Sequence, residues 1–114
     1  MKSYRIPIVV LSVFLLILFL YAAAKAQAQT QTSNTAKAMT IINANECLSC
    51  HTINGVGGSV GPSLSKEGAK GRSVSWLKVQ ISDPSAHYPS GIMPRFHLKP
   101  AQLETVAQYL ESLK

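Results

Sequence analysis

The only two cysteines of the chain lie three residues apart, and a histidine follows directly, in the pentapeptide Cys47-Leu48-Ser49-Cys50-His51. Two thiols at this spacing can reach the two vinyl groups of one haem and form thioethers with them. The imidazole of His51 then lies beneath the iron as the proximal ligand. The C-x-x-C-H pattern therefore predicts one covalently attached haem c, with Cys47, Cys50 and His51 as binding residues and His51 as a metal ligand.

Three other uses of the paired cysteines are open at this stage, and the rest of the sequence disfavours each of them. A structural zinc site needs two more ligands, and only His87 and His97 are available, both in one irregular segment. A thioredoxin-like redox pair belongs in a βαβ context, which this sequence lacks. A disulfide between residues three apart closes too short a loop to add much stability.

Residues 1–28 differ from the rest and predict either a signal peptide or an N-terminal membrane anchor. Lys2 and Arg5 form a short basic start, and the next 19 residues, 6–24, carry no charge. Small residues around Ala24 and Ala28 offer cleavage sites, whereas residues 6–24 are also long enough to anchor the chain in a membrane. Both outcomes place the remainder outside the cytoplasm, in the periplasm or on the outer face of the cytoplasmic membrane.

Residues 29–35 are polar and uncharged and predict a flexible spacer, so that the folded domain covers residues 36–114. Within it we expect three helices, over residues 36–47, 73–82 and from Pro100 to the C-terminus. Gly-rich and Pro-rich loops separate them, which predicts an all-α domain with long loops. A domain of this size builds only a marginal core from side chains, and a bound haem would supplement it.

The charge of the domain limits the classes of partner. Residues 36–114 contain eight Lys and Arg against five Asp and Glu, a net charge of +3. This modest basic excess favours acidic protein partners or an anionic surface. Because no dense Lys/Arg run with interleaved aromatic residues is present, nucleic acid binding is not expected.

From about Thr35 to Lys114 the sequence resembles a monohaem class I cytochrome c. The matching pieces are the CLSCH motif, a Gly-rich loop reaching Gly61-Pro62, a Trp-bearing helix ending in Asp-Pro, the segment Met93-Pro94-Arg95-Phe96 and a terminal amphipathic helix. The resemblance implies a small cytochrome c fold in which three main helices and long loops surround one haem. It implies that Met93 is the distal iron ligand, that the Pro62 carbonyl accepts the Nδ1 proton of His51, and that the first and last helices cross beside the haem.

The chemistry of Met93 supports the same role. A thioether is a neutral, soft ligand that favours ferrous iron and raises the reduction potential. Met93 lies 42 residues after His51, in a loop restrained by Gly91 and Pro94. A core methionine is the alternative, and His87 or His97 could instead complete a bis-His haem of lower potential.

Several further residues have candidate roles around the haem. Trp76 is a candidate cofactor-binding residue, either donating its indole N–H to a haem propionate or packing in the core. Arg72 and Arg95 are candidate propionate neighbours, with solvation as the alternative. Tyr109 is expected near the haem or between helices. A basic rim for transient docking would draw on Lys66, Lys70, Lys78, Arg95 and Lys99.

A haem with His and Met ligands has no open position for a substrate, so we expect a one-electron carrier between exported or membrane-bound redox proteins rather than an enzyme. The alternative is a haem c electron-transfer subunit of a larger oxidoreductase or oxidase, in which the partner is permanent. Peroxidase or ligand-sensing activity would require Met93 to leave the iron, and no distal acid–base residue supports it.

Overall fold

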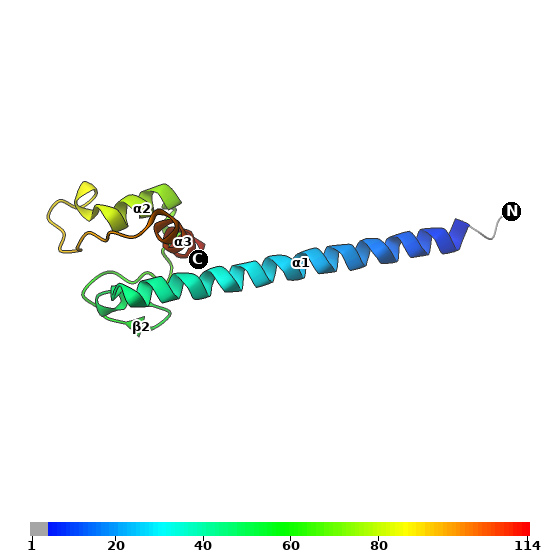
Figure 1. Cartoon of the computed structure of the whole chain (residues 1–114), viewed down its shortest axis with the longest axis horizontal. Coiled ribbons are helices and arrows are strands. Elements are labelled where there is room, and N and C mark those ends of the chain that lie inside the picture. The colour runs from blue at the N-terminus through cyan, green and yellow to red at the C-terminus, as the bar shows by residue number, and fades with distance from the viewer. Residues whose placement is uncertain (1–4) are drawn as a thin grey trace. The chain divides into compact units, whose positions relative to one another are not determined.

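The computed structural model describes residues 5–114 and divides the chain into two compact units, one ending at Ser33 and one spanning Asn34–Lys114. Figure 1 shows the elements in chain order from blue to red. They are the helices α1 (Arg5–Ala44), α2 (Val74–Ser82) and α3 (Pro100–Ser112), the short 3₁₀ turns η1 (Cys47–Ser49), η2 (Gly68–Lys70) and η3 (Pro84–Ala86), and the strands β1 (Thr52–Ile53) and β2 (Val56–Gly57).

Helix α1 begins far earlier than the predicted start at residue 36. Residues 29–35, for which a flexible spacer was expected, are helical. The segment holds no Gly or Pro to break a helix, and the Thr30 and Thr32 hydroxyls donate to the carbonyls of Ala26 and Ala28, at 3.1 and 3.0 Å. The boundary between the two units still falls within this segment, after Ser33.

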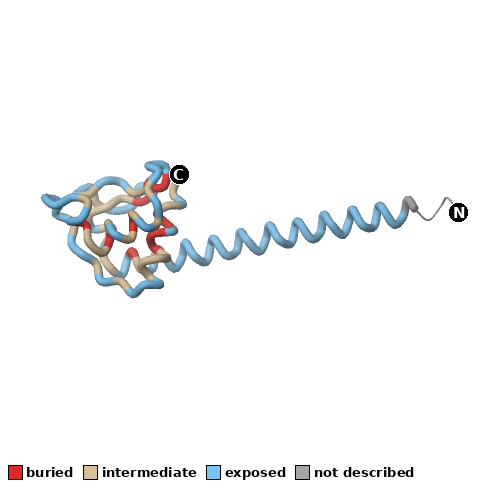
Figure 2. The backbone as a smooth tube through the Cα atoms, turned by 90° about the horizontal axis from the view of Figure 1, so that it is seen from above, coloured by how far each residue is buried: buried red, intermediate tan, exposed pale blue. Residues whose placement is uncertain are grey.

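The first part of α1 is apolar and exposed. Every residue from 7 to 37 is exposed, as the pale blue tube in Figure 2 shows. The stretch contains an 18-residue window with a mean hydropathy of 2.7, which is long and apolar enough to cross a membrane. A signal sequence near an N-terminus meets the same criterion. Lys2, the first charge of the predicted leader, lies outside the described residues.

The two later helices lie close to where the sequence predicts them. Ser73 caps α2, because its side-chain oxygen accepts a hydrogen bond from the Trp76 backbone N–H at 3.1 Å. The helix ends before Asp83-Pro84. Pro100 opens α3 at its first turn, where its missing N–H has no intrahelical partner to lose. Both predicted helices are therefore confirmed.

A small hairpin between η1 and η2 was not predicted. Ile53 pairs with Val56 in antiparallel register, and Asn54 and Gly55 form the turn with φ angles of 50° and 81°. An Asn-Gly pair is the usual sequence of a two-residue hairpin turn with positive φ at both positions, so the signal was present in the sequence.

The core of the second unit joins the end of α1 to α2, β1 and α3. Ala38 and Ile42 of α1 belong to the same buried cluster as Val106, Ala107 and Leu110 of α3. Figure 2 shows the buried backbone in red inside this unit. Tyr109 is buried within the cluster, and Met39 packs against it from α1. The second unit is thus an all-α domain, apart from the two-residue strands.

Candidate functional site

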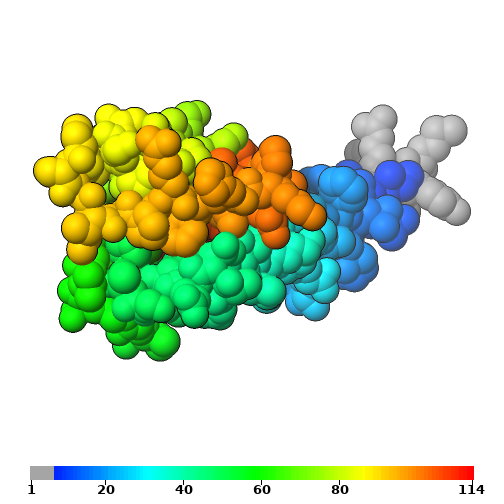
Figure 3. Space-filling view, turned by 60° about the vertical axis from the view of Figure 1, so that its left-hand side comes forward, coloured from blue at the N-terminus to red at the C-terminus, as the bar shows by residue number. Residues whose placement is uncertain are grey.

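A large cavity lies in the second unit. It has a volume of about 730 Å³ and is enclosed by residues from α1, the hairpin region, α2, the loop before α3, and α3 itself. Figure 3 shows this loop in orange, lying against the green segment that carries the cysteine motif. Most of the wall is apolar, with Ile42, Leu77, Ile81, Val106 and Leu110 among its residues. The volume lies in the range of sites for small molecules and cofactors.

The cysteine motif forms one side of this cavity. Glu46 takes a left-handed conformation with φ of 55°, which ends the helical path of α1 and turns the chain into η1. The turn is closed by hydrogen bonds from Ser49 N to Glu46 O at 2.9 Å and from His51 N to Cys47 O at 3.0 Å. Cys47, Cys50 and His51 all line the cavity, and no disulfide joins the two cysteines. Burial raises the pKa of the unmodified Cys47 thiol above its ordinary value.

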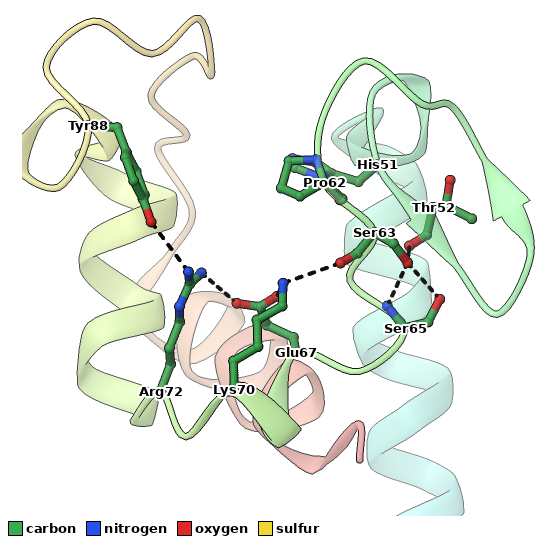
Figure 4. Close-up of polar contacts among 9 residues, drawn as sticks. All are labelled: His51, Thr52, Pro62, Ser63, Ser65, Glu67, Lys70, Arg72 and Tyr88. Carbon is green, nitrogen blue, oxygen red and sulfur yellow. Dashed lines mark hydrogen bonds and ion pairs between the residues drawn. The ribbon is translucent and has the colours of Figure 1, made fainter.

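The imidazole of His51 is oriented by the loop that follows the hairpin. Its Nδ1 lies 2.8 Å from the carbonyl oxygen of Pro62. Figure 4 labels both residues, which lie close together. A carbonyl can only accept, so Nδ1 donates the proton and the lone pair of Nε2 is free to bind a metal. Gly61 passes so close that a Cβ there would lie 2.6 Å from His51 Cε1. The glycine therefore lets the loop approach the ring closely enough for the carbonyl contact.

Met93 also lines the cavity, on a loop attached to the end of α2. The backbone N–H of Phe96 donates to the Ile81 carbonyl at 3.1 Å, and Arg95 pairs with Asp83 at 2.8 Å. The Ser85 hydroxyl, followed by Arg95, lowers the pKa of the Asp83 carboxyl below its ordinary value. These contacts hold the residues that directly follow Met93 against the corner between α2 and η3.

The two histidines considered as alternative ligands do not line the cavity. His87 stacks on Trp76, with ring centroids 4.2 Å apart and planes inclined by 1°, and its Nδ1 lies 3.0 Å from Gln80 Oε1. His97 is exposed. Met93 is thus the candidate distal residue that faces the same space as His51.

Trp76 is not among the residues that line the cavity, in contrast to the role predicted for it at the cofactor. Its ring packs against His87 and also carries the Arg72 guanidinium 4.1 Å from its centroid. Helical spacing sets this placement, because the cavity-lining residues Leu77 and Ile81 are turned away from Trp76 around the axis of α2, and Gln80, one turn after Trp76, lies between the two directions. The structure therefore favours the packing alternative for Trp76.

A buried charge cluster at the cavity wall was not predicted. Glu67 is 1% exposed, and its carboxylate binds Lys70 at 2.6 Å and Arg72 at 2.8 Å. Arg72 also donates to the Tyr88 hydroxyl at 3.3 Å, and Figure 4 shows these contacts. A buried carboxylate needs such partners, because an unpaired one is strongly disfavoured. Glu67 lies between Lys66 and Lys70 in the sequence, and nothing in this charged segment indicates that its carboxylate is buried.

The residues of the cavity fit a covalently bound haem. Two thiols, an imidazole with a free Nε2 and a thioether all line one apolar space. The zinc alternative has no comparable site, because no group of three or more His, Cys, Asp or Glu side chains suited to a metal occurs in the described part of the chain. The thioredoxin alternative needs a βαβ unit, and the strands described here form only a two-residue hairpin.

Comparison with known proteins gives one family. Searches among curated proteins and among solved structures each found no significant match. The family model described as Cytochrome c matches residues 35–114, which is most of the chain and all of the cavity. The resemblance drawn from the motifs and the all-α fold agree with this match. The chain therefore belongs to the cytochrome c family, whose members are haem-based electron carriers, and it carries one covalently attached haem c.

Proposed function

We propose that this protein is a one-electron carrier in which His51 and Met93 are the two axial ligands of the haem iron. The observation that carries the proposal is that the imidazole, with its free Nε2, and the thioether line the same apolar cavity. When bound there, haem supplies reversible one-electron chemistry between ferrous and ferric iron.

The protein's own groups have distinct tasks in this proposal. Cys47 and Cys50 fix the haem to the chain beside His51. Pro62 holds the His51 proton on Nδ1 and keeps Nε2 directed at the iron. The apolar wall excludes water and favours the less charged ferrous state. With both axial positions filled, no site is left for a substrate, which favours electron transfer over catalysis.

One edge of the cavity is open to a partner. Val60 and Ile92 both line the cavity, yet they are 67% and 83% exposed. A haem held in the cavity would meet a docked protein at this edge. Of the predicted basic rim, Lys70, Lys78 and Arg95 are engaged in ion pairs with carboxylates. We therefore propose that docking to acidic redox partners relies on Lys66 and Lys99, which form no ion pair with the residues that the structure describes, and that its rate falls as salt is raised.

The ligand assignment is tested by absorption spectroscopy of the ferric protein. The far-red charge-transfer band from thioether to iron is expected in the unmodified protein and should vanish in Met93→Ala, with a lower reduction potential. Met39→Ala is the matched control, because Met39 packs against the core without lining the cavity. An unchanged band in Met93→Ala would remove Met93 from the iron.

The second candidate is a haem c subunit of a larger oxidoreductase or oxidase. The exposed apolar residues Val60 and Ile92 at the cavity edge favour it, since an apolar patch suits a lasting interface. Extraction from the native host with a mild detergent, followed by sizing of the haem-containing particle, separates the two. A particle of the chain's own mass supports the carrier, and a larger stable particle supports the subunit.

We infer that the domain functions outside the cytoplasm, in the periplasm or on the outer face of the membrane. The apolar stretch of α1 supports both a signal peptide over residues 1–28 and an anchor over residues 6–24. Mass spectrometry of the native protein determines its N-terminus and distinguishes them. A mass that retains residues 6–24 supports the anchor, and a start near residue 29 supports cleavage.

A further inference from the structure

Gln80 of α2 connects Met93 to a histidine that lies away from the cavity. Its Nε2 lies 3.5 Å from the Met93 sulfur, within the range of a hydrogen bond to sulfur. Its Oε1 lies 3.0 Å from Nδ1 of His87. One carboxamide thus contacts the candidate iron ligand with one end and the histidine with the other.

The chemistry of the two ends fixes the direction of this chain of contacts. The amide oxygen accepts, so His87 Nδ1 must carry a proton and donate it. The amide nitrogen then faces Met93 and donates to the sulfur, which is a weak acceptor. If the amide were turned over, an oxygen would face the sulfur and an N–H would face a protonated Nδ1, and both hydrogen bonds would be lost. His87 therefore determines which end of Gln80 meets Met93.

Trp76 determines in turn where His87 lies. The two rings are parallel, with centroids 4.2 Å apart, and the Arg72 guanidinium lies over the Trp76 ring. The stack holds the imidazole in one plane, so Nδ1 keeps its direction toward Gln80. Trp76 therefore acts on the Met93 side of the cavity through His87 and Gln80, although it does not line the cavity itself.

We propose that Gln80 is a positioning residue for the Met93 thioether, and that His87, stacked on Trp76, sets the orientation of the Gln80 amide. The inference rests on the proposed axial role of Met93. A thioether sulfur has two lone pairs. Because the N–H of Gln80 engages one of them, only the other is left for the iron, and this fixes the orientation of the Met93 side chain. The positive end of the N–H dipole also disfavours the ferric charge and raises the reduction potential.

The test compares three variants of the full haem-loaded protein. Gln80→Leu removes the donor to sulfur, His87→Phe keeps an aromatic ring on Trp76 but removes the donor to Gln80, and the third variant combines both. The readouts are the midpoint potential and the concentration of added imidazole that displaces Met93 from ferric iron. Gln108→Leu is the matched control, because it removes the same amide from an exposed site on α3, where Gln108 donates to Glu104.

We expect Gln80→Leu to lower the potential and to make displacement by imidazole about fivefold easier, the factor that corresponds to one hydrogen bond. His87→Phe should change both readouts in the same direction by a smaller amount. The double variant should match Gln80→Leu alone, because His87 acts only through Gln80. Gln108→Leu should leave both readouts unchanged.

Two outcomes overturn the inference: unchanged readouts in Gln80→Leu, or single-variant effects that add in the double variant. If Gln80→Leu does not fold, Gln80→Glu replaces it, since a carboxylate keeps the shape and cannot donate to sulfur. The proposed function fails separately, by absence of the far-red band in the unmodified protein. A protein with the band and an insensitive Gln80 refutes the positioning role alone.

Discussion

At the scale of single residues, the approach of Gly61 constrains the position of the His51 ring. The ring and the Pro62 carbonyl are 2.8 Å apart from Nδ1 to oxygen, and the glycine between them leaves no room for a side chain. A methyl group at this position must displace either the ring or the loop. The orientation of the candidate iron ligand therefore depends on a residue with no side chain of its own.

We expect Gly61→Ala to destabilise the haem-loaded domain by about 1–3 kcal/mol, the usual range for an overpacked site, and to change the absorption spectrum. Gly55→Ala is the control. Its φ of +81° strains any side chain, but nothing lies within 4 Å of the added carbon. Thermal unfolding should show a loss for both variants, whereas a spectral change should follow only Gly61→Ala. Equal spectra for the two would contradict the proposed constraint.

Asp83 gives the Met93 loop a dependence on pH. Its pKa is lowered in the folded state by the Ser85 hydroxyl and by Arg95, so its contacts stabilise the fold at neutral pH. This contribution is lost as the pH falls below the ordinary aspartate pKa of about 3.9 and through the lower folded value. The melting temperatures of the unmodified protein and of Asp83→Asn should differ slightly at pH 7 and converge in acid. A gap that widens in acid would refute this account.

Cavity-lining residues could be predicted from the sequence where haem attachment or iron coordination requires a particular residue type. Cys47, Cys50, His51 and Met93 all line the cavity, and so does Pro62, which the resemblance to the family had implied. Trp76 does not, and Glu67 and Gln80 were missed. The positions of Trp76 and Gln80 depend on which face of α2 meets the cavity, and Met93, the partner of Gln80, lies 13 positions further along the chain. Glu67 depends on how the fold buries it beside Lys70 and Arg72. A single sequence carries no direct signal for such pairs.

At the scale of elements, α2 is the support on which the distal side is built. It carries Gln80 and Ile81, both of which contact the Met93 segment, and its end adjoins the Asp83 ion pair. The helix has only nine residues, and a helix so short is marginal by itself. Its cap at Ser73 and its packing against the core therefore determine whether it forms.

Replacing this cap should weaken the distal side. We expect Ser73→Ala to cost about 1 kcal/mol, because the Trp76 N–H loses the hydroxyl oxygen that accepts its hydrogen bond. Ser73→Asp should restore most of the stability, since aspartate is an equally good cap. Chemical denaturation followed by the haem absorbance measures both variants. A Ser73→Asp variant as weak as Ser73→Ala would show that the cap is not the cause.

The helices were predicted correctly where capping or helix-breaking residues mark their ends, and incorrectly where such residues are absent. Ser73 and Asp83-Pro84 bracket α2, and Pro100 opens α3, so both helices were predicted close to their observed bounds. Residues 29–35 have neither periodicity nor breakers, and their polar composition was interpreted as a spacer although they continue α1. Composition alone does not distinguish a solvated helix from a coil.

At the scale of the whole molecule, the chemistry is confined to the second unit. The cavity is lined by residues between Ile41 and Leu110, and the buried core runs from Ala38 to Leu110. The unit begins at Asn34. Neither the core nor the cavity draws on the apolar segment before it.

A chain shortened to residues 34–114, exported behind a cleavable signal from another protein, should therefore attach haem and keep its spectrum and potential. The full-length chain expressed in the same host is the reference. Absorption spectra and redox titration compare the two. A colourless shortened domain would mean that the earlier residues contribute to the fold.

The haem should be indispensable for the fold of this unit. Without it, the small core would enclose a cavity of about 730 Å³, far more space than a protein interior of this size tolerates. We expect a Cys47→Ala/Cys50→Ala variant that fails to retain haem to lose its near-ultraviolet circular dichroism and cooperative unfolding. The haem-loaded protein should keep both. A cooperative transition without haem would contradict this expectation.

The spacing of the two candidate ligands along the chain has a consequence for biogenesis. The contact that orients His51 closes a loop of only 11 residues, to Pro62, whereas Met93 lies 42 residues away and needs α2 in place. Short loops close at a lower entropic cost than long ones. We expect the attachment half of the domain to be ready for the maturation machinery while the rest is still emerging from the translocon. The loop that carries Met93 would then fold last, over a haem that is already attached to Cys47 and Cys50.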